Sequence, residues 1–246
     1  MIYLIQCTLG ISWWSDLRKS DAKMGAGEIP GEPTERGGKA MYTCAYCTVL
    51  ACGQEHPETM PANCPMRDRN MVEAAFKRYE EDEVKDFYIC SSEIESLGYG
   101  QWVRVKETME FCRKMGYHRI GLAFCKGLRK EARILADILK KNGFDTVSVI
   151  CKTGGIDKTR AGIPDERKIH PGGFEPMCNP ILQAELLNGQ KTEFNIALGL
   201  CVGHDSLFYK NSQAMVTTLV VKDRVLAHNP AGALYCAEGY YSEKLQ

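Results

Sequence analysis

Apolar residues recur along the chain at two different spacings, and the point where the spacing changes separates two kinds of structure. Between residues 70 and 115 they lie three and four positions apart among many charged residues, which is the period of an amphipathic α-helix. We predict three helices there, over residues 70–83, 84–97 and 101–115. From residue 119 onward, short continuous apolar runs alternate with amphipathic stretches, which is typical of strands and helices in turn.

The second half of the chain carries the pattern of an α/β domain. Four apolar runs predict buried strands, at residues 119–124, 144–150, 194–200 and 215–221. Amphipathic stretches predict helices between them, at residues 128–141, 179–189 and 204–211. Strands that are apolar throughout and alternate with helices indicate a parallel sheet covered on both faces. The predicted fold class is therefore α/β, with a Rossmann-like parallel-sheet domain over residues 118–236 and a tail over residues 237–246.

Three segments precede this domain. Residues 1–40 include a Gly- and Pro-rich stretch that buries little apolar surface, so we predict a disordered leader. The purine-rich codons implied by residues 35–39 resemble a ribosome-binding site, and we therefore expect the native chain to start at Met41. A cysteine-rich segment over residues 41–70 and a helical segment over residues 71–117 follow.

The charge balance argues against some partners. Lys and Arg total 31, and so do Asp and Glu, so the net charge is zero. The chain thus lacks the excess positive charge with which most nucleic-acid-binding proteins attract phosphates. No apolar run approaches the roughly 20 residues that span a bilayer, so we expect neither nucleic acid nor a membrane as partner. The motifs GxGxxG, P-loop and HExxH are missing as well, so the sequence predicts no nucleotide cofactor.

The 12 cysteines are the feature that points to chemistry. Residues 1–14 lack the basic region and the cleavage site of a secretion signal, so we expect a cytoplasmic protein, in which disulfides are rare. Many cysteines without disulfides indicate metal binding or redox chemistry. Several of the 12 must nevertheless be ordinary core residues, because a free cysteine is also a small buried hydrophobe.

One group of cysteines is compact in sequence: Cys44, Cys47, Cys52 and Cys64 fall within 21 residues. A CxxC turn can bring two sulfurs to one metal ion. The segment is too short and polar to have its own core, so we expect metal binding to fold it. Zinc and an iron–sulfur cluster both accept four thiolates, and His56 is an additional candidate ligand.

A second group lies at the ends of predicted elements. Cys125, Cys151 and Cys201 each follow a predicted strand, and Cys178 precedes a predicted helix. The carboxyl ends of strands in an open parallel sheet form the ligand crevice. We therefore expect Cys125, Cys178 and Cys201 to hold one metal centre, a [4Fe–4S] cluster or Zn²⁺, with Cys151 as a fourth ligand or a spare thiol.

Basic residues near the same edge are candidates for binding an anionic substrate. Lys152, Lys158, Arg160 and Arg167 lie in the loop between the second strand and the following helix. Residues 222–224, with the sequence Lys-Asp-Arg, follow the fourth strand, and we expect them to reach this edge too.

Three functions remain open on these residues. The first is a cytoplasmic iron–sulfur protein that uses its cluster for redox or sulfur-related chemistry, with a redox partner or a small-molecule substrate. The second is a non-catalytic zinc-binding or sensor module. The third is an enzyme in which Cys178 or Cys201 is the nucleophile and His204 the base, although His204 is equally well explained as an ordinary residue at a helix start.

Several longer strings resemble one known family. They are CAYC (44–47), IGLAFC (120–125), FEPMCNPI (174–181), GLCVGHD (199–205) and VKDRVLAHNP (221–230). These strings are similar to those of the metal-binding protein family called domain of unknown function 1847, which occurs mainly in anaerobic bacteria and archaea. The resemblance covers residues 41–236 and implies metal binding and an anaerobic host.

Overall fold

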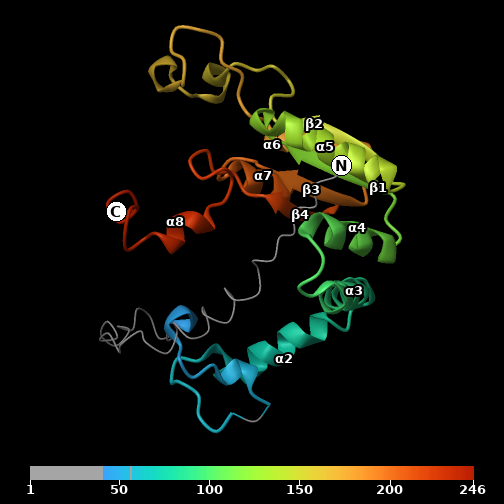
Figure 1. Cartoon of the computed structure of the whole chain (residues 1–246), viewed down its shortest axis with the longest axis vertical. Helices are drawn as coiled ribbons and strands as arrows, with labels where there is room; N and C mark the ends of the chain where they lie inside the picture. The colour runs from blue at the N-terminus through green and yellow to red at the C-terminus, as the bar shows by residue number, and fades with distance from the viewer. Residues whose placement is uncertain (1–40, 56) are drawn as a thin grey trace, which may run out of the picture. The chain divides into compact units, whose positions relative to one another are not determined.

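The structure, a computed structural model, describes residues 41–55 and 57–246. The chain forms two compact units, one that ends at Lys77 and one that begins at Arg78 (Figure 1). The predicted leader, residues 1–40, and the candidate ligand His56 lie outside the described residues.

The first unit has almost no apolar core among its described residues. It contains three short 3₁₀ helices, at Cys44–Tyr46, Ala51–Gly53 and Pro65–Arg67, and most of helix α2 (Arg69–Arg78). Ala51 is the single buried residue described in this unit, and α2 buries none of its side chains. Because apolar burial is the main favourable term in folding, this unit gains little of that stabilisation.

The second unit is built on a four-stranded parallel sheet. Its strands are β1 (Arg119–Phe124), β2 (Asp145–Ile150), β3 (Phe194–Leu198) and β4 (Met215–Val220). Their spatial order is β2-β1-β3-β4, and all neighbouring pairs are parallel. Every residue of β3 and all but the first of β1 are buried, as central strands covered on both faces must be. The predicted α/β class is confirmed.

Helices cover both faces of this sheet. They are α3 (Asp82–Gly98), α4 (Arg104–Lys114), α5 (Arg129–Lys141), α6 (Pro180–Gly189) and α7 (His204–Asn211), and the short α8 (Ala231–Tyr235) follows β4. Ile120 and Leu122 of β1 belong to a core shared with α3, α4 and α5, whereas Ala123 belongs to a second core with Ala184 of α6 and Phe208 of α7. Alternate strand residues face opposite sides of a sheet, so the unit has three layers.

The observed elements lie close to the predicted ones. The boundary between the two compact units falls within residues 71–117. Cys90 of α3 and Met109 of α4 belong to the sheet core. Helix α8 is too short to give a periodic apolar pattern and is not predicted. None of the helices described in residues 41–246 is long and apolar enough to cross a membrane.

The strand order opens a crevice at the carboxyl ends of β1 and β3. Helix α5 carries the chain from β1 to β2 over one face, and α7 carries it from β3 to β4 over the other. The chain therefore leaves these neighbouring strands in opposite directions, which is where open α/β sheets bind ligands. Gly199, directly after β3, has a φ of +65°, and a Cβ there would lie 2.6 Å from Cδ1 of Leu128. Glycine at this position lets the chain turn out of the sheet.

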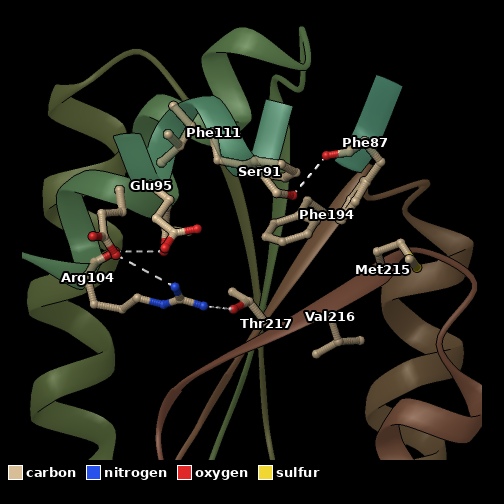
Figure 2. A pocket seen from close by; sticks show the side chains of 12 residues that line it. Phe87, Ser91, Glu95, Arg104, Phe111, Phe194, Met215, Val216 and Thr217 are labelled. Carbon is tan, nitrogen blue, oxygen red and sulfur yellow. Dashed lines mark hydrogen bonds and ion pairs between the residues drawn. The ribbon is translucent and has the colours of Figure 1, made fainter. Parts of the chain in front are cut away.

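A separate cavity of about 530 Å³ lies at the opposite, amino-terminal ends of β3 and β4 (Figure 2). Helices α3 and α4 line it with aromatic side chains, among them Phe87 and Phe111. Arg104 donates a hydrogen bond to Oγ1 of Thr217 at 2.9 Å and pairs with Glu107 at 3.6 Å. The described residues that line this cavity include neither Cys nor His, so the residues predicted to carry chemistry lie elsewhere.

Candidate functional site

Four cysteines from four separate segments line one small pocket at the carboxyl edge of the sheet. Cys125 directly follows β1, Cys151 directly follows β2, Cys201 lies three residues after β3, and Cys178 lies two residues before α6. Gln183, Leu200 and His204 complete the lining. The space between these side chains does not admit a water molecule. All four cysteines predicted at this edge thus lie around the same point.

Backbone hydrogen bonds fix the positions of three of these cysteines. The amide of Cys125 donates to the carbonyl of Leu198 at 3.1 Å, and the amide of Cys151 donates to the carbonyl of Phe124 at 2.9 Å. Asn179, next to Cys178, donates its amide to the carbonyl of Cys151 at 2.8 Å. The first two bonds continue the pairing of β1 with β3 and of β2 with β1 past the ends of the strands.

Hydrogen bonding with Cys151 is the main cause of the pKa shifts at Cys125 and Cys178. These hydrogen bonds lower the pKa of the Cys125 and Cys178 thiols, and Lys222 and Lys152 respectively lower it further. The same hydrogen bonds raise the pKa of the Cys151 thiol. Deprotonation is thus favoured at Cys125 and Cys178 over Cys151.

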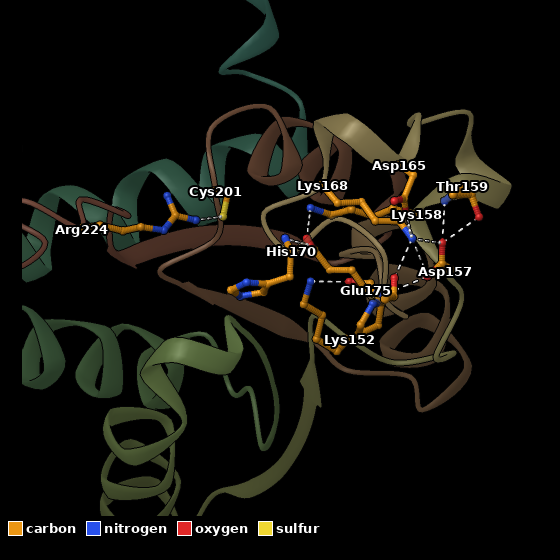
Figure 3. Close-up of polar contacts among 12 residues, drawn as sticks. Lys152, Asp157, Lys158, Thr159, Asp165, Lys168, His170, Glu175, Cys201 and Arg224 are labelled. Atoms are coloured by element: carbon orange, nitrogen blue, oxygen red, sulfur yellow. Dashed lines mark hydrogen bonds and ion pairs between the residues drawn. The ribbon is translucent and has the colours of Figure 1, made fainter.

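Two cations from the segment after β4 contact sulfurs of the pocket. Nζ of Lys222 lies 3.3 Å from Sγ of Cys125, and Nη2 of Arg224 lies 3.0 Å from Sγ of Cys201 (Figure 3). Both side chains are donors, so the sulfurs are the acceptors. Residues 222–224 do reach this edge of the sheet.

Two buried polar atoms of residues that line the pocket have no hydrogen-bond partner. The side-chain amide of Gln183 donates from Nε2 to the carbonyls of Val149 at 2.8 Å and Phe124 at 3.3 Å, and its Oε1 is unpaired. Nδ1 of His204 is unpaired as well. An unsatisfied buried polar group costs about 1–3 kcal/mol, and an occupant of the pocket that offers a cation or a hydrogen-bond donor would remove that cost.

Gln183 is the pocket residue that sequence reasoning missed. It is fully buried in α6, on the same side as Ala184 and Leu187. A polar residue within an apolar helical stripe is the signal that would have identified it, because such a residue needs a partner inside the protein.

The loop between Cys151 and α6 is held by a cluster of charged residues (Figure 3). The Lys168 side chain is only 4% exposed and pairs with Asp157 at 3.1 Å and Asp165 at 2.9 Å. The backbone amide of Glu175 donates to Oδ2 of Asp157 at 2.8 Å, and Lys158 pairs with the Glu175 carboxylate. These contacts connect the two ends of the loop and so help to position Cys178.

Two of the basic residues predicted to bind an anionic substrate are already engaged in this loop. Lys158 pairs with Glu175, and Nζ of Lys152 donates to the carbonyl of Pro176 at 2.6 Å. Arg160 and Arg167 are exposed. The loop thus uses its lysines to hold its own backbone.

Three cysteines of the first unit, Cys44, Cys47 and Cys64, lie at the ends of its short 3₁₀ helices, and Cys52 lies within one. Cys44 and Cys52 are exposed, and Cys47 and Cys64 are half-buried. Asn63 links the ends of this segment, because its Nδ2 donates to Oγ1 of Thr43 at 2.7 Å.

Both cysteine groups offer side chains of the type that binds metal. The described side chains are not yet arranged in a way that would hold an ion. Thiolates are the preferred ligands of zinc and of iron–sulfur clusters, and the pocket at the sheet edge stabilises thiolates. Within residues 41–55 and 57–246, however, no three Cys, His, Asp or Glu side chains stand close enough together to hold an ion as they are. Metal binding would therefore require the thiol hydrogen bonds to break and the side chains to turn.

The remaining described cysteines, Cys90, Cys112 and Cys236, belong to neither cysteine group. Cys90 and Cys112 are buried in the core, and burial raises the pKa of both thiols, that of Cys112 to about 12. They are the small buried hydrophobes that composition leads one to expect. Cys236 is exposed near the end of the chain.

Comparison with known proteins agrees with the family resemblance of sequence strings such as IGLAFC (120–125) and GLCVGHD (199–205). A family model described as "Protein of unknown function (DUF1847)" matches residues 64–219. That range includes Cys64 and the four cysteines of the pocket but ends before Lys222 and Arg224. "Uncharacterized protein MJ0455" of Methanocaldococcus jannaschii is 47% identical over 177 residues, which cover 72% of this chain and 89% of the relative. No solved structure matches the chain significantly. On the family match and this identity, the protein belongs to the DUF1847 family.

Proposed function

We propose that the protein is a cytoplasmic metal protein whose main centre is held by Cys125, Cys151, Cys178 and Cys201. The observation that carries the proposal is that four cysteines from four separate segments line one pocket at the topological switch point of the sheet. Cys125 and Cys151 also belong to the apolar core, but core packing by itself does not call for four cysteines from separate segments around one pocket.

The occupant we favour from the sequence is an iron–sulfur cluster. Bound there, it would supply electron transfer or, if one iron lacks a protein ligand, Lewis-acid or sulfur-related chemistry. His204 would then serve as a proton carrier, because its ring lines the same pocket. The partner would be a redox protein or a small molecule.

Zinc is the alternative occupant, and the size of the pocket favours it. The pocket as it stands admits no water, so one ion requires less movement of the cysteines than a cluster. In that case the protein would be a zinc-binding or sensor module. The first unit would hold a second, structural metal through Cys44, Cys47, Cys52 and Cys64, and the near lack of buried side chains among its described residues supports metal-coupled folding there.

Anaerobic purification followed by iron, zinc and acid-labile sulfide analysis tests the proposal. We expect bound metal, and we expect Cys125→Ser and Cys201→Ser to lose one centre while Cys236→Ser, which alters an exposed thiol outside the pocket, keeps it. Sulfide with iron identifies a cluster, whereas zinc without sulfide identifies the alternative. A protein with no metal, or pocket variants with the full metal content of Cys236→Ser, would overturn the metal centre.

A thiol enzyme is the second candidate. The observation that favours it is that Cys178, whose pKa is lowered by hydrogen bonding to Cys151 and by Lys152, lines the pocket together with His204. Metal-free protein that turns over a substrate, and loses that activity when Cys178 is alkylated, would favour this function.

A further inference from the structure

We infer that Lys222 and Arg224 are built-in counter-charges of the metal centre, which set its affinity for metal and the potential of any cluster it holds. The inference rests on the proposed function. It adds two residues that are not metal ligands but stabilise the metal-bound state. They act through the sulfurs of Cys125 and Cys201 and are therefore positioning residues.

The contacts are specific to the two sulfurs. Lys222 is half-buried and reaches Sγ of Cys125 at 3.3 Å, and Arg224 reaches Sγ of Cys201 at 3.0 Å. These partners are 97 and 23 residues apart in sequence. A Cβ at Gly127 would lie 3.2 Å from Nζ of Lys222 and 3.9 Å from Sγ of Cys125. The absence of a side chain at Gly127 thus leaves room for the ammonium group beside the sulfur.

The backbone of this segment presents both cations to the same side. Residues 222 and 224 are two apart, and the residue between them, Asp223, instead caps the following turn. Its Oδ1 accepts hydrogen bonds from the amides of Val225 and Leu226, both at 2.8 Å.

The same turn is closed by His228 and holds an unfavourable backbone conformation. The amide of Asp223 donates to Nδ1 of His228 at 3.1 Å, and the amide of His228 donates to the carbonyl of Asp223 at 2.9 Å. Ala227 and His228 have φ values of +52° and +65°, which non-glycine residues rarely adopt. These hydrogen bonds hold the turn that follows Lys222 in one conformation.

Charge arithmetic gives the reason for two cations. Four thiolates with either one divalent ion or a cluster core of charge 2+ leave two negative charges in the pocket. The ammonium of Lys222 and the guanidinium of Arg224 offset both. Cations that donate hydrogen bonds to ligand sulfurs stabilise the loaded centre, and they raise a cluster's reduction potential because the reduced form is more negative.

A Cd²⁺ titration of the reduced, metal-free full-length chain tests the inference. Binding is measured by the thiolate-to-metal charge-transfer absorption. All proteins carry Cys44→Ser and Cys47→Ser, so that the first unit does not contribute. We expect Lys222→Met and Arg224→Met each to bind Cd²⁺ about 10–100-fold more weakly at unchanged stoichiometry. Lys222→Arg, which keeps the charge, recovers most of the affinity, and Lys210→Met, at an exposed position of α7, has no effect.

The outcomes separate the inference from the proposed function. Equal affinity in Lys222→Met, Arg224→Met and Lys210→Met overturns the inference and leaves the metal centre standing. A parent protein whose absorption does not depend on Cys125 and Cys201 overturns both. Circular dichroism shows whether Lys222→Met is folded. If it is not, Arg224→Met decides the test, because Arg224 is exposed and its replacement does not disturb the core. If the chain purifies with a cluster, Lys222→Met must also lower its reduction potential.

Discussion

Cys151 influences the charge of the pocket, because hydrogen bonding with it is the main cause that lowers the pKa of the Cys125 and Cys178 thiols. Burial without such a partner instead raises the pKa of a thiol, as at Cys112. At the scale of the residue, the pocket is thus distinguished from the core by its hydrogen bonds rather than by its burial.

Replacing Cys151 should raise the pKa of Cys178, since the hydrogen bond from Cys151 is the main cause that lowers it. We expect Cys151→Ala to move the alkylation of Cys178 by iodoacetamide to higher pH in the reduced, metal-free protein, because only the thiolate reacts. Cys151→Ser keeps a donor and should shift the profile less. Peptide mass spectrometry across a pH series measures both, and identical profiles for the parent and Cys151→Ala would contradict the prediction.

At the scale of the element, the turn after β3 depends on Gly199 for two separate reasons, its positive φ and the contact with Leu128. Gly155 has a φ of +54° with no atom within 4 Å of a Cβ, so it isolates the first reason. We expect Gly155→Ala to lower the free energy of unfolding by about 1 kcal/mol and Gly199→Ala to lower it by about 2–4 kcal/mol.

Denaturant unfolding measures both values, and a double variant tests the cause of the larger one. Leu128→Ala should relieve the clash, so the combined loss in Gly199→Ala with Leu128→Ala should be smaller than the sum of the two single losses. Additive losses would show that the contact does not matter.

The loop between Cys151 and α6 is a second element whose order depends on few groups. Lys168 pairs with both Asp157 and Asp165, and its removal leaves two carboxylates facing each other. We expect Lys168→Met to make residues 152–177 sensitive to protease while the sheet stays folded, since none of the buried apolar core lies in the loop. Arg160→Met, at an exposed position of the same loop, is the control. Equal cleavage patterns would show that the ion pairs do not hold the loop.

At the scale of the whole molecule, the two units differ in what stabilises them. The second has a continuous apolar core on both faces of its sheet, whereas Ala51 is the single buried residue described in the first. We therefore expect removal of metal from the full chain by a chelator to abolish amide protection from hydrogen exchange in residues 41–77 and to leave β1 and β3 protected. Exchange that is unchanged in residues 41–77, or that increases equally in both units, would contradict metal-coupled folding.

The sequence by itself determined the layered α/β fold and the edge at which the cysteines gather. Both follow from short-range patterns: apolar runs mark the strands, and parallel connections bring every carboxyl end to the same side of the sheet. Cys125, Cys151 and Cys201 therefore had to emerge at one edge, whatever the order of the strands.

Only the tertiary structure decided which side chains meet at that edge. The contact between Lys222 and Cys125 joins residues 97 apart and requires β1 and β4 to flank β3. Gln183 has its role because α6 brings its side-chain amide to the carbonyls of Phe124 in β1 and Val149 in β2. No local pattern encodes such contacts, because they depend on the strand order and on packing between elements that are distant in the chain.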